Sequence, residues 1–495
     1  MLKILNTLSG EKEPFTPIEP AEVGIYTCGP TVYGSPHIGN LRAYIFADTL
    51  RRTLEYLHYK VKQVVNITDV GHLVSDESEG EDKLEKGARA TGRSVWDVAR
   101  GYEKEFIEAL KKLNIEMPAV FPRATEHIRD QSEMIRTLSK KGFTYEISDG
   151  IYFDTSKFEG YGKLSGQKLE EKEAGTRVEI KSEKKHPADF ALWKFCVGEN
   201  LNHTMRWDFE SGSDLSAEPH LTEEENRKKK IGFPGWHIEC SAMSVKYLGE
   251  RFDIHTGGVD HIPVHHENEI AQSEASFGHP FVNYWMHNEF ILVGGGKMSK
   301  SLGNAYTLDD ILEKWGISPL VFRHFCLTAH YRSKLNFTEE SIKAAQSGYL
   351  RLILRLSELK QSVVYPINEA QQKNLRENYE NFFEEAISDD LNTPKALAVL
   401  FDLLRDKELS RDSKIALAKK FDRVLGLDLL GEIGVEYVKE SIYDKLDNQI
   451  KQRVDEREEA RKQKDYEKSD VIREELESLG YLVEDTPEGP RVTKI

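Results

Sequence analysis

The sequence is poor in cysteine. It has four cysteines among 495 residues, and no two of them form a C-x-x-C pair. This number excludes the dense disulfide framework of small secreted domains and is typical of a protein that works in the reducing cytoplasm. Cys196 and Cys326 lie in no recognisable motif, so we expect them to be small buried side chains.

Long apolar runs and an excess of positive charge are also missing. No run approaches the roughly 20 residues that span a bilayer, and residues 1–15 lack the apolar core of a signal peptide. Lys and Arg number 68 against 84 Asp and Glu, a net charge of −16. This balance speaks against a membrane partner and against nonspecific coating of DNA or RNA, although a local basic patch remains possible. We predict a cytoplasmic globular protein of two to four domains.

The stretch Thr27–Asn40 is the first sign of a ligand site. The apolar runs Val23–Tyr26 and Val61–Ile67 on either side of it predict buried strands, and Leu41–Leu57 has helical spacing. The loop is rich in Gly, Pro and Ser, and such a loop lies at the carboxyl edge of a parallel sheet. Helix N-termini at this edge favour phosphate, so His37 and Asn40 are candidate hydrogen-bond donors there. Gly39 would let a ligand approach the backbone.

Four motifs, in this order, carry a family resemblance. His37-Ile38-Gly39-Asn40 resembles the HIGH signature of class I aminoacyl-tRNA synthetases, and residues 297–301, Lys-Met-Ser-Lys-Ser, are identical to their KMSKS signature. Pro234–Met243 and His265–Glu269 resemble the cysteinyl-tRNA synthetase family, and the likeness covers nearly the whole chain. Asn40 replaces the commoner histidine of the first motif; it can donate a hydrogen bond but cannot carry charge.

The resemblance implies an α/β fold. We expect a class I Rossmann-type nucleotide-binding catalytic domain with an inserted connective domain, then an α-helical bundle and a small C-terminal α+β anticodon-binding domain. A single charged helix is expected over Glu85–Leu113. The polar stretch 200–230 is either a solvated loop or a basic flap against the tRNA acceptor stem. The expected boundaries are 1–117 and 231–290 for the two catalytic halves, 118–230 for the insertion, 291–338 for the KMSKS loop and connecting segment, 339–432 for the bundle and 433–495 for the C-terminal domain.

The resemblance also implies one zinc ion per chain. Its ligands would be Cys28, Cys240, His265 and Glu269, a set of two thiolates, one imidazole and one carboxylate that suits zinc. His265 and Glu269 are four residues apart, which places them on one face of a helix, whereas the two cysteines are too distant in sequence for spacing to join them. A metal that prefers thiolate would separate cysteine from serine, a distinction for which an apolar pocket gives only ~10–200-fold.

The implied reaction activates L-cysteine with ATP and then transfers it to the terminal ribose of tRNA(Cys). ATP would arrive with Mg²⁺, and the enzyme is expected to be a monomer. The catalytic candidates are His37, Asn40, Lys297 and Lys300. ATP would also contact Gly39, Gly257, Gly258 and Asp260. Cysteine would contact Gly29, Thr68, Trp236 and His255. His237, His255 and His261 could equally be histidines of the core.

A basic face is expected near the C-terminus. Tyr466 could stack on an unpaired anticodon base, whereas a salt-bridged exposed helix is the alternative reading of this segment. The face comprises Arg453, Arg457, Arg461, Lys464 and Lys468.

Three rival functions are weaker. A cysteine ligase for an amino-sugar pseudodisaccharide would lack the nearly two hundred residues after Ser301. A zinc hydrolase would need an H-E-x-x-H pattern, which His265–Glu269 is not. A nonenzymatic RNA-binding descendant of a synthetase would be expected to lose the signature residues, which are present here.

Overall fold

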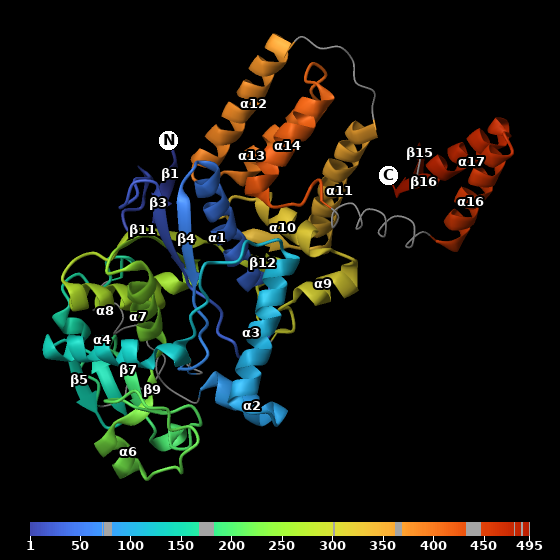
Figure 1. The fold of residues 1–495 in the computed structure, drawn as a ribbon. Helices are drawn as coiled ribbons and strands as arrows, with labels where there is room; N and C mark the ends of the chain where they lie inside the picture. The colour runs from blue at the N-terminus through green and yellow to red at the C-terminus, as the bar shows by residue number, and fades with distance from the viewer. Residues whose placement is uncertain are drawn as a thin grey trace.

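A four-stranded parallel sheet forms the centre of the molecule (Figure 1). This structure is a computed structural model, which describes residues 1–71, 73, 82–167, 183–299, 302–361, 369–431, 447–479, 481–486 and 489–494. The strand order is β11-β10-β3-β4, so the sequence-distant β10 lies directly beside β3. The sheet consists of β3 (Glu22–Thr27), β4 (Lys60–Val65), β10 (Phe252–Gly258) and β11 (Val282–Asn288).

Alternation along β3 explains how the sheet is covered on both sides. Val23 and Ile25 pack in one cluster with Leu50 and Leu54 of α1 (Ile38–Tyr56). Gly24, on the opposite face, lies close to Leu248 at the end of α7 (Trp236–Leu248). Successive residues of a strand point to opposite faces, so one strand supports both helices. The strand–helix–strand unit predicted around residues 27–40 is therefore confirmed.

Two helices replace the single one expected over Glu85–Leu113. α2 (Lys83–Thr91) ends at Gly92, whose φ of 65° is the left-handed conformation that glycine tolerates. α3 (Val95–Lys112) then begins after Ser94, whose side chain accepts a hydrogen bond from the Asp97 amide. The prediction was wrong because these capping residues end one helix and begin another, although the pattern of charged residues continues across them.

The inserted domain is built on a five-stranded antiparallel sheet in the order β5-β6-β7-β9-β8. β9, which begins just after the boundary expected at residue 230, pairs with β7 and β8 of this sheet. The polar stretch 200–230 is not only loop, since it contributes β8 and the capped helix α6. The elements are α4 (Ile128–Lys140), β5 (Thr144–Ile147), β6 (Gly150–Phe153), β7 (Phe190–Phe195), β8 (Trp207–Asp208), α6 (Glu223–Lys229) and β9 (Ile231–Pro234).

A small sheet and a helical bundle follow the catalytic sheet. The small sheet has the order β13-β12-β14 and carries the start of the KMSKS segment. Helices α11 to α14 lie together at one end of the molecule (Figure 1). All four lie within the bundle expected over 339–432, and α12 buries few apolar side chains. The elements are α8 (Glu267–Phe277), β12 (Ile291–Val293), β13 (Gly296–Lys297), α9 (Leu308–Trp315), α10 (Pro319–Leu327), β14 (Leu335–Phe337), α11 (Glu339–Gln361), α12 (Glu369–Ser388), α13 (Thr393–Arg405) and α14 (Arg411–Leu425).

The C-terminal unit has a core of its own, centred on Val454, Ile472 and Leu476. It consists of α16 (Asn448–Lys462), α17 (Tyr466–Ser478) and the antiparallel strands β15 (Tyr481–Thr486) and β16 (Gly489–Lys494). Within the described ranges, no helix is both long enough and apolar enough to cross a bilayer.

Candidate active site and metal centre

The predicted nucleotide loop lines a cavity of about 540 Å³ at the carboxyl edge of the central sheet. Residues 27–37 form one wall of the cavity, and the loop after β10 forms another. Of the residues predicted from motifs, those that line it are Cys28, Gly29, His37, Gly39, Asn40, Trp236, Gly257, Gly258, Asp260 and Lys297. Lys300 lies outside the described residues.

His37 and Asn40 form a reciprocal cap at the start of α1. The Asn40 amide N–H donates to His37 Nδ1 at 3.2 Å, and the His37 amide N–H donates to Asn40 Oδ1 at 3.3 Å. Since Nδ1 accepts, the proton of a neutral His37 ring lies on Nε2. The reciprocal cap uses His37 Nδ1 and Asn40 Oδ1, so His37 Nε2 and Asn40 Nδ2 are the side-chain donors that the cap itself does not use.

The KMSKS segment packs against the start of α1 through Met298. Met298 comes so close to α1 that a Cβ at Gly39 would lie 3.3 Å from its Sδ. Asn304 closes the segment, because its Oδ1 accepts from the Ser299 amide at 2.7 Å and its Nδ2 donates to the Lys297 carbonyl at 3.2 Å. His37, Gly39 and Asn40 therefore line the same cavity as Lys297 and Met298, although almost 260 residues separate the two signatures in the sequence.

Four buried ligand atoms converge beside the cavity, which Cys28 itself lines. The ligand atoms of Cys28, Cys240, His265 and Glu269 all lie within 4.8 Å of one another. His265 Nε2 lies 3.0 Å from Glu269 Oε1, and Cys28 Sγ lies 3.9 Å from the same oxygen. His265 lies in a π-helical turn, Ile262–His266, and Glu269 lies in the first turn of α8, where a plain α-helix was expected. Such π turns are frequent at functional sites.

The donor set fits a zinc ion. Two thiols, an imidazole and a carboxylate are the ligands that zinc prefers, and all four are buried. Burial raises the pKa of Cys28 to about 11, which keeps the thiol neutral unless a cation is present. A second set, Cys28, His255, His266 and Glu269, shares two of these ligands. It offers only one sulfur where the first set offers two, so the first set suits zinc better.

Histidines surround the candidate ligands and orient them. His255 Nε2 lies 2.8 Å from Glu269 Oε2, and His266 Nε2 lies 3.2 Å from Cys28 Sγ. His237 Nδ1 lies 3.0 Å from His265 Nδ1. Burial alone would raise the pKa of Glu269, but the imidazoles of His255 and His265 outweigh it and hold that pKa well below its ordinary value. Burial opposes the charged form of His265, yet Glu269 and Cys240 raise its pKa to about 10.

Two residues predicted to contact cysteine lie behind the cavity wall. His255 is fully buried and its Nε2 faces Glu269, so it touches a candidate ligand. Thr68 is also buried, and its hydroxyl donates to Glu239 Oε1 at 2.5 Å. Sequence reasoning missed Glu239, although it lies inside the matched motif 234–243. It also missed His287, which carries no motif signal and lies 2.7 Å from His266.

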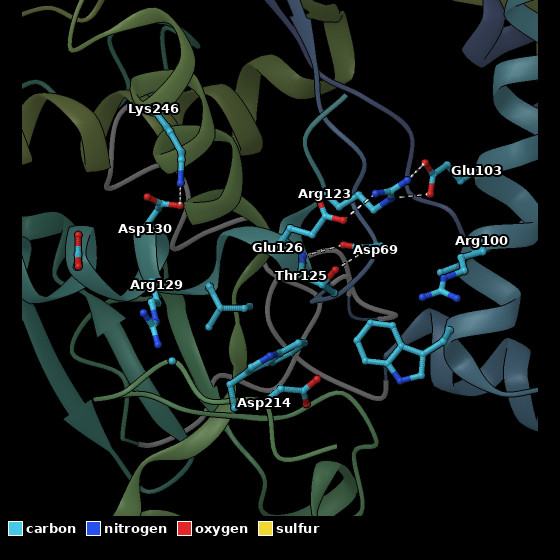
Figure 2. Close-up of a pocket in the computed structure, with 16 residues that line it drawn as sticks. Asp69, Arg100, Glu103, Arg123, Thr125, Glu126, Arg129, Asp130, Asp214 and Lys246 are labelled. Atoms are coloured by element: carbon cyan, nitrogen blue, oxygen red, sulfur yellow. Dashed lines mark hydrogen bonds and ion pairs between the residues drawn. The ribbon is translucent and has the colours of Figure 1, made fainter. Parts of the chain in front are cut away.

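A larger cavity of about 870 Å³ lies between α3 and the inserted domain (Figure 2). Arg123 forms ion pairs there with Glu103 and Glu126, both at 2.7 Å, and Asp69 accepts from the Thr125 hydroxyl at 2.6 Å. These pairs brace the segment after β4 against its neighbours. None of the residues predicted from motifs lines this cavity, so the candidate site is the smaller one.

The predicted basic face at the C-terminus is not continuous. The chain turns between α16 and α17, where Lys464 has a φ of 64°, so Lys468 lies on a different helix from Arg453. Arg457 is buried and paired with Glu458 at 2.9 Å, and Arg453 pairs with Glu456 and Glu475. At Arg453 and Arg457 the structure therefore agrees with the alternative reading, in which these arginines form salt bridges with glutamates. Tyr466 is 58% exposed and remains a candidate stacking platform.

Comparison with known proteins gives one consistent result. The family model for the tRNA synthetases class I (C) catalytic domain matches residues 14–212 and 225–347. A DALR domain matches 382–432, and a cysteinyl-tRNA ligase anticodon binding domain matches 445–491. Cysteine–tRNA ligase 1 of Burkholderia lata is 45% identical over 99% of this chain and 96% of that protein. Cysteine–tRNA ligase of Thermus thermophilus is 43% identical over 99% and 98%.

A solved structure supports the fold. Methionyl-tRNA synthetase of Mycobacterium tuberculosis, in complex with methionyl-adenylate, matches with a TM-score of 0.56 at 16% identity. The match covers 84% of this chain and 93% of that one. The family models and the full-length relatives show that the chain belongs to the cysteine–tRNA ligase family of class I aminoacyl-tRNA synthetases.

Proposed function

We propose that this ligase selects its amino acid through a zinc ion held by Cys28, Cys240, His265 and Glu269. The observation that carries the proposal is the convergence of these four buried donors beside the signature loop. When bound, zinc would supply an affinity for the substrate thiolate that the hydroxyl of serine does not match. Gly29 and Trp236, which line the cavity, remain candidates to hold the rest of cysteine, whereas Thr68 is buried against Glu239. His255 would orient Glu269 instead of touching the substrate.

The activation step consists of positioning and charge stabilisation. The cysteine carboxylate attacks the α-phosphorus of ATP, the bond from that phosphorus to the bridging oxygen breaks, and diphosphate leaves with Mg²⁺. His37 and Asn40 donate hydrogen bonds to phosphate oxygens. Lys297 and Lys300 meet the charge that develops on diphosphate, and the loop glycines 257 and 258 with Asp260 hold the ATP ribose. A Cβ at Gly258 would come within 2.3 Å of Asp260 Oδ1, which supports this close packing.

The second step transfers the cysteinyl group from AMP to a hydroxyl of the terminal ribose of tRNA(Cys). Tyr466 and its neighbours on α17 would contact the anticodon. The chain would act as a monomer in the cytoplasm, where aminoacyl-tRNA is used for protein synthesis. Analytical sedimentation at several protein concentrations tests whether the protein is a monomer.

Zinc content and amino acid binding test the metal together. Protein purified without added metal should hold about one zinc per chain by elemental analysis, since all four ligands belong to the chain. Cys240→Ser should lose the metal and cysteine binding together, while ATP still binds. Cys196→Ala, a buried cysteine outside the cluster, is the matched control and should keep both. Full activity with less than half an equivalent of zinc would refute the metal's role.

Lys300→Ala tests the phosphate step. Because the lysine meets charge that develops only as diphosphate leaves, its loss should slow cysteine-dependent ATP–diphosphate exchange by about 100-fold or more. The KM for cysteine should stay close to the wild-type value. A variant with a normal exchange rate and a raised KM for cysteine would contradict this role.

A further inference from the structure

Arg42 is a buried cation with an unusual set of partners. It lies on α1 two residues after Asn40, and only 2% of its surface is exposed. Nη1 donates to the carbonyls of Glu289 and Phe290 at 2.9 and 2.7 Å. Nη2 donates to the carbonyl of Ser333 at 2.6 Å, with longer contacts to those of His330 and Tyr331 at 3.3 and 3.5 Å. Among the residues that the structure describes, no carboxylate lies within ion-pair distance of Arg42.

The two segments that Arg42 holds lead into the sheet that carries the KMSKS segment. Residues 289–290 precede β12, and residues 330–333 precede β14. β12 pairs in parallel with β14, and it pairs with β13 in antiparallel register, which places Leu292 opposite Lys297. Phe290, Leu292 and Lys334 themselves line the active cavity. One guanidinium thus joins the helix that bears His37 and Asn40 to the strands that bear Lys297.

The chemistry of arginine suits this junction. Its planar fork presents five N–H donors in fixed directions and can serve two loops at once, whereas a lysine is a single flexible point charge. Burying a cation without an anion is costly, and an apolar side chain would fill the same space at less cost. Burial lowers the pKa of Arg42, which reflects that cost. We therefore attribute the presence of arginine at this position to the need to hold the two loops in a fixed geometry.

We propose that Arg42 is a positioning residue for adenylate formation, which sets Lys297 and its hairpin at the correct place relative to His37 and Asn40. The inference rests on the proposed role of Lys297 at diphosphate. Arg42 touches no substrate and acts only through the two loops.

A double-mutant cycle between Arg42→Lys and Lys297→Ala tests this directly. The readout is ATP–diphosphate exchange, with zinc content and the KM for cysteine measured on each preparation. Arg42→Lys should lower the exchange kcat by about 10- to 100-fold, because small displacements at a reacting centre have effects of this size. Zinc content should not change, and the KM for cysteine should stay within about two-fold. In the Lys297→Ala background, Arg42→Lys should add less than about three-fold, because the group it positions is gone.

Arg52→Lys is the matched control. Arg52 is a second buried arginine of α1, but it contacts Asp48 and the carbonyls of Asn114 and Arg423, away from the KMSKS sheet. Its substitution should leave exchange within about three-fold of the parent in both backgrounds, because sites with no shared partner add independently. Hydrogen exchange is a second readout: the amides of β12 and β13 should exchange faster in Arg42→Lys, while those of α13 should not change.

The outcomes separate the inference from the proposal beneath it. Equal effects of Arg42→Lys in the two backgrounds, or an unchanged kcat, overturn the inference alone. A Lys297→Ala variant of normal activity overturns the role of Lys297 and the inference with it. If Arg42→Lys does not fold, Arg42→Gln replaces it in the cycle. If neither variant folds, Arg42 determines folding and not positioning, and the inference is overturned.

Discussion

At the scale of single residues, the candidate metal centre depends on a hydrogen-bonded chain of side chains. Cys28 Sγ lies 3.2 Å from His266, which lies 2.7 Å from His287, and His287 in turn lies 2.7 Å from the hydroxyl of Thr7. Buried partners of this kind fix the orientation of a metal ligand and are commonly as necessary as the ligand itself. The N-terminal segment of the chain thus supports the site through Thr7, a residue without any motif.

Gly29 is a residue whose size alone should decide activity. A Cβ at this position would lie 1.4 Å from the carbonyl oxygen of Asn66, so alanine forces the backbone next to Cys28 to move. We expect Gly29→Ala to reduce the free energy of unfolding by about 2–3 kcal/mol and to weaken cysteine binding. Gly24→Ala, where the nearest atom would lie 3.5 Å away, is the control and should change neither. Chemical denaturation and calorimetric titration with cysteine measure both, and a Gly29→Ala protein that behaves like Gly24→Ala would contradict this reading.

At the scale of elements, irregular turns position several of the functional side chains. The π turn Ile262–His266 sets His265 and Glu269 on one face, and the hairpin between β12 and β13 brings Lys297 back beside Leu292. Two glycines in that hairpin, Gly294 and Gly295, have φ values of 56° and 81°, which other residues adopt rarely. His265, Glu269 and Lys297 therefore lie where regular structure begins or ends and the backbone changes direction.

The helical pair α10 and α11 should be sensitive to acid through His324. Its ring is buried against Gly348, and burial lowers its pKa to about 4. In the unfolded chain His324 has a pKa near 6.5 and binds a proton more readily than in the folded protein. The neutral ring therefore contributes to the free energy of unfolding at pH 7, and this contribution is lost as the pH falls below about 6.5. We expect a loss of about 2 kcal/mol between pH 7 and pH 5 from this residue.

Substitution of His324 checks the assignment. His324→Leu should remove about that amount from the difference between urea unfolding at pH 7 and at pH 5. His279→Leu, at an exposed histidine in the catalytic domain, should leave the difference as it is. An equal pH dependence in His324→Leu and the parent protein would exclude His324 as the cause.

At the scale of the whole molecule, a buried polar junction joins the catalytic domain to the helical bundle. Asp48 of α1 accepts from Arg323 of α10 at 2.5 Å and from Arg52 at 2.8 Å. Arg323 also donates to the carbonyl of Leu425 at the end of α14. The helix whose first turn carries His37 and Asn40 is thus fixed at its middle to the domain that follows the active site. The C-terminal unit, in contrast, has a separate core.

A chain that ends at Gly431 should separate the two steps of the reaction. The core of residues 450–492 contains no residue of the catalytic domain, so its removal should leave adenylate formation intact. Charging of tRNA should fall, because contacts remote from the chemistry orient the acceptor end, and part of the loss should depend on salt. Diphosphate exchange and aminoacylation are measured on one preparation whose fold is checked by circular dichroism. Equal retention of both activities would show that the segment is not needed for tRNA.

The sequence by itself determined the local units and the chemistry of the site. Apolar spacing located β3, α1 and β4, and the two signatures identified the class, because both depend on residues close together in the chain. It did not determine where local signals end: Gly92 and Lys464 each divide a charged stretch that reads as one helix.

Only the tertiary structure decided which distant residues meet. Cys28 and Glu269 are 241 positions apart, and they converge because β10 inserts beside β3 in the sheet and carries its following helix with it. Arg42 shows the same limit: the sequence places it on a helix, but its five carbonyl partners come from loops about 250 and 290 residues away. Backbone carbonyls carry no residue-type signal, so no motif could reveal this junction. Long-range packing, and not local preference, sets such contacts.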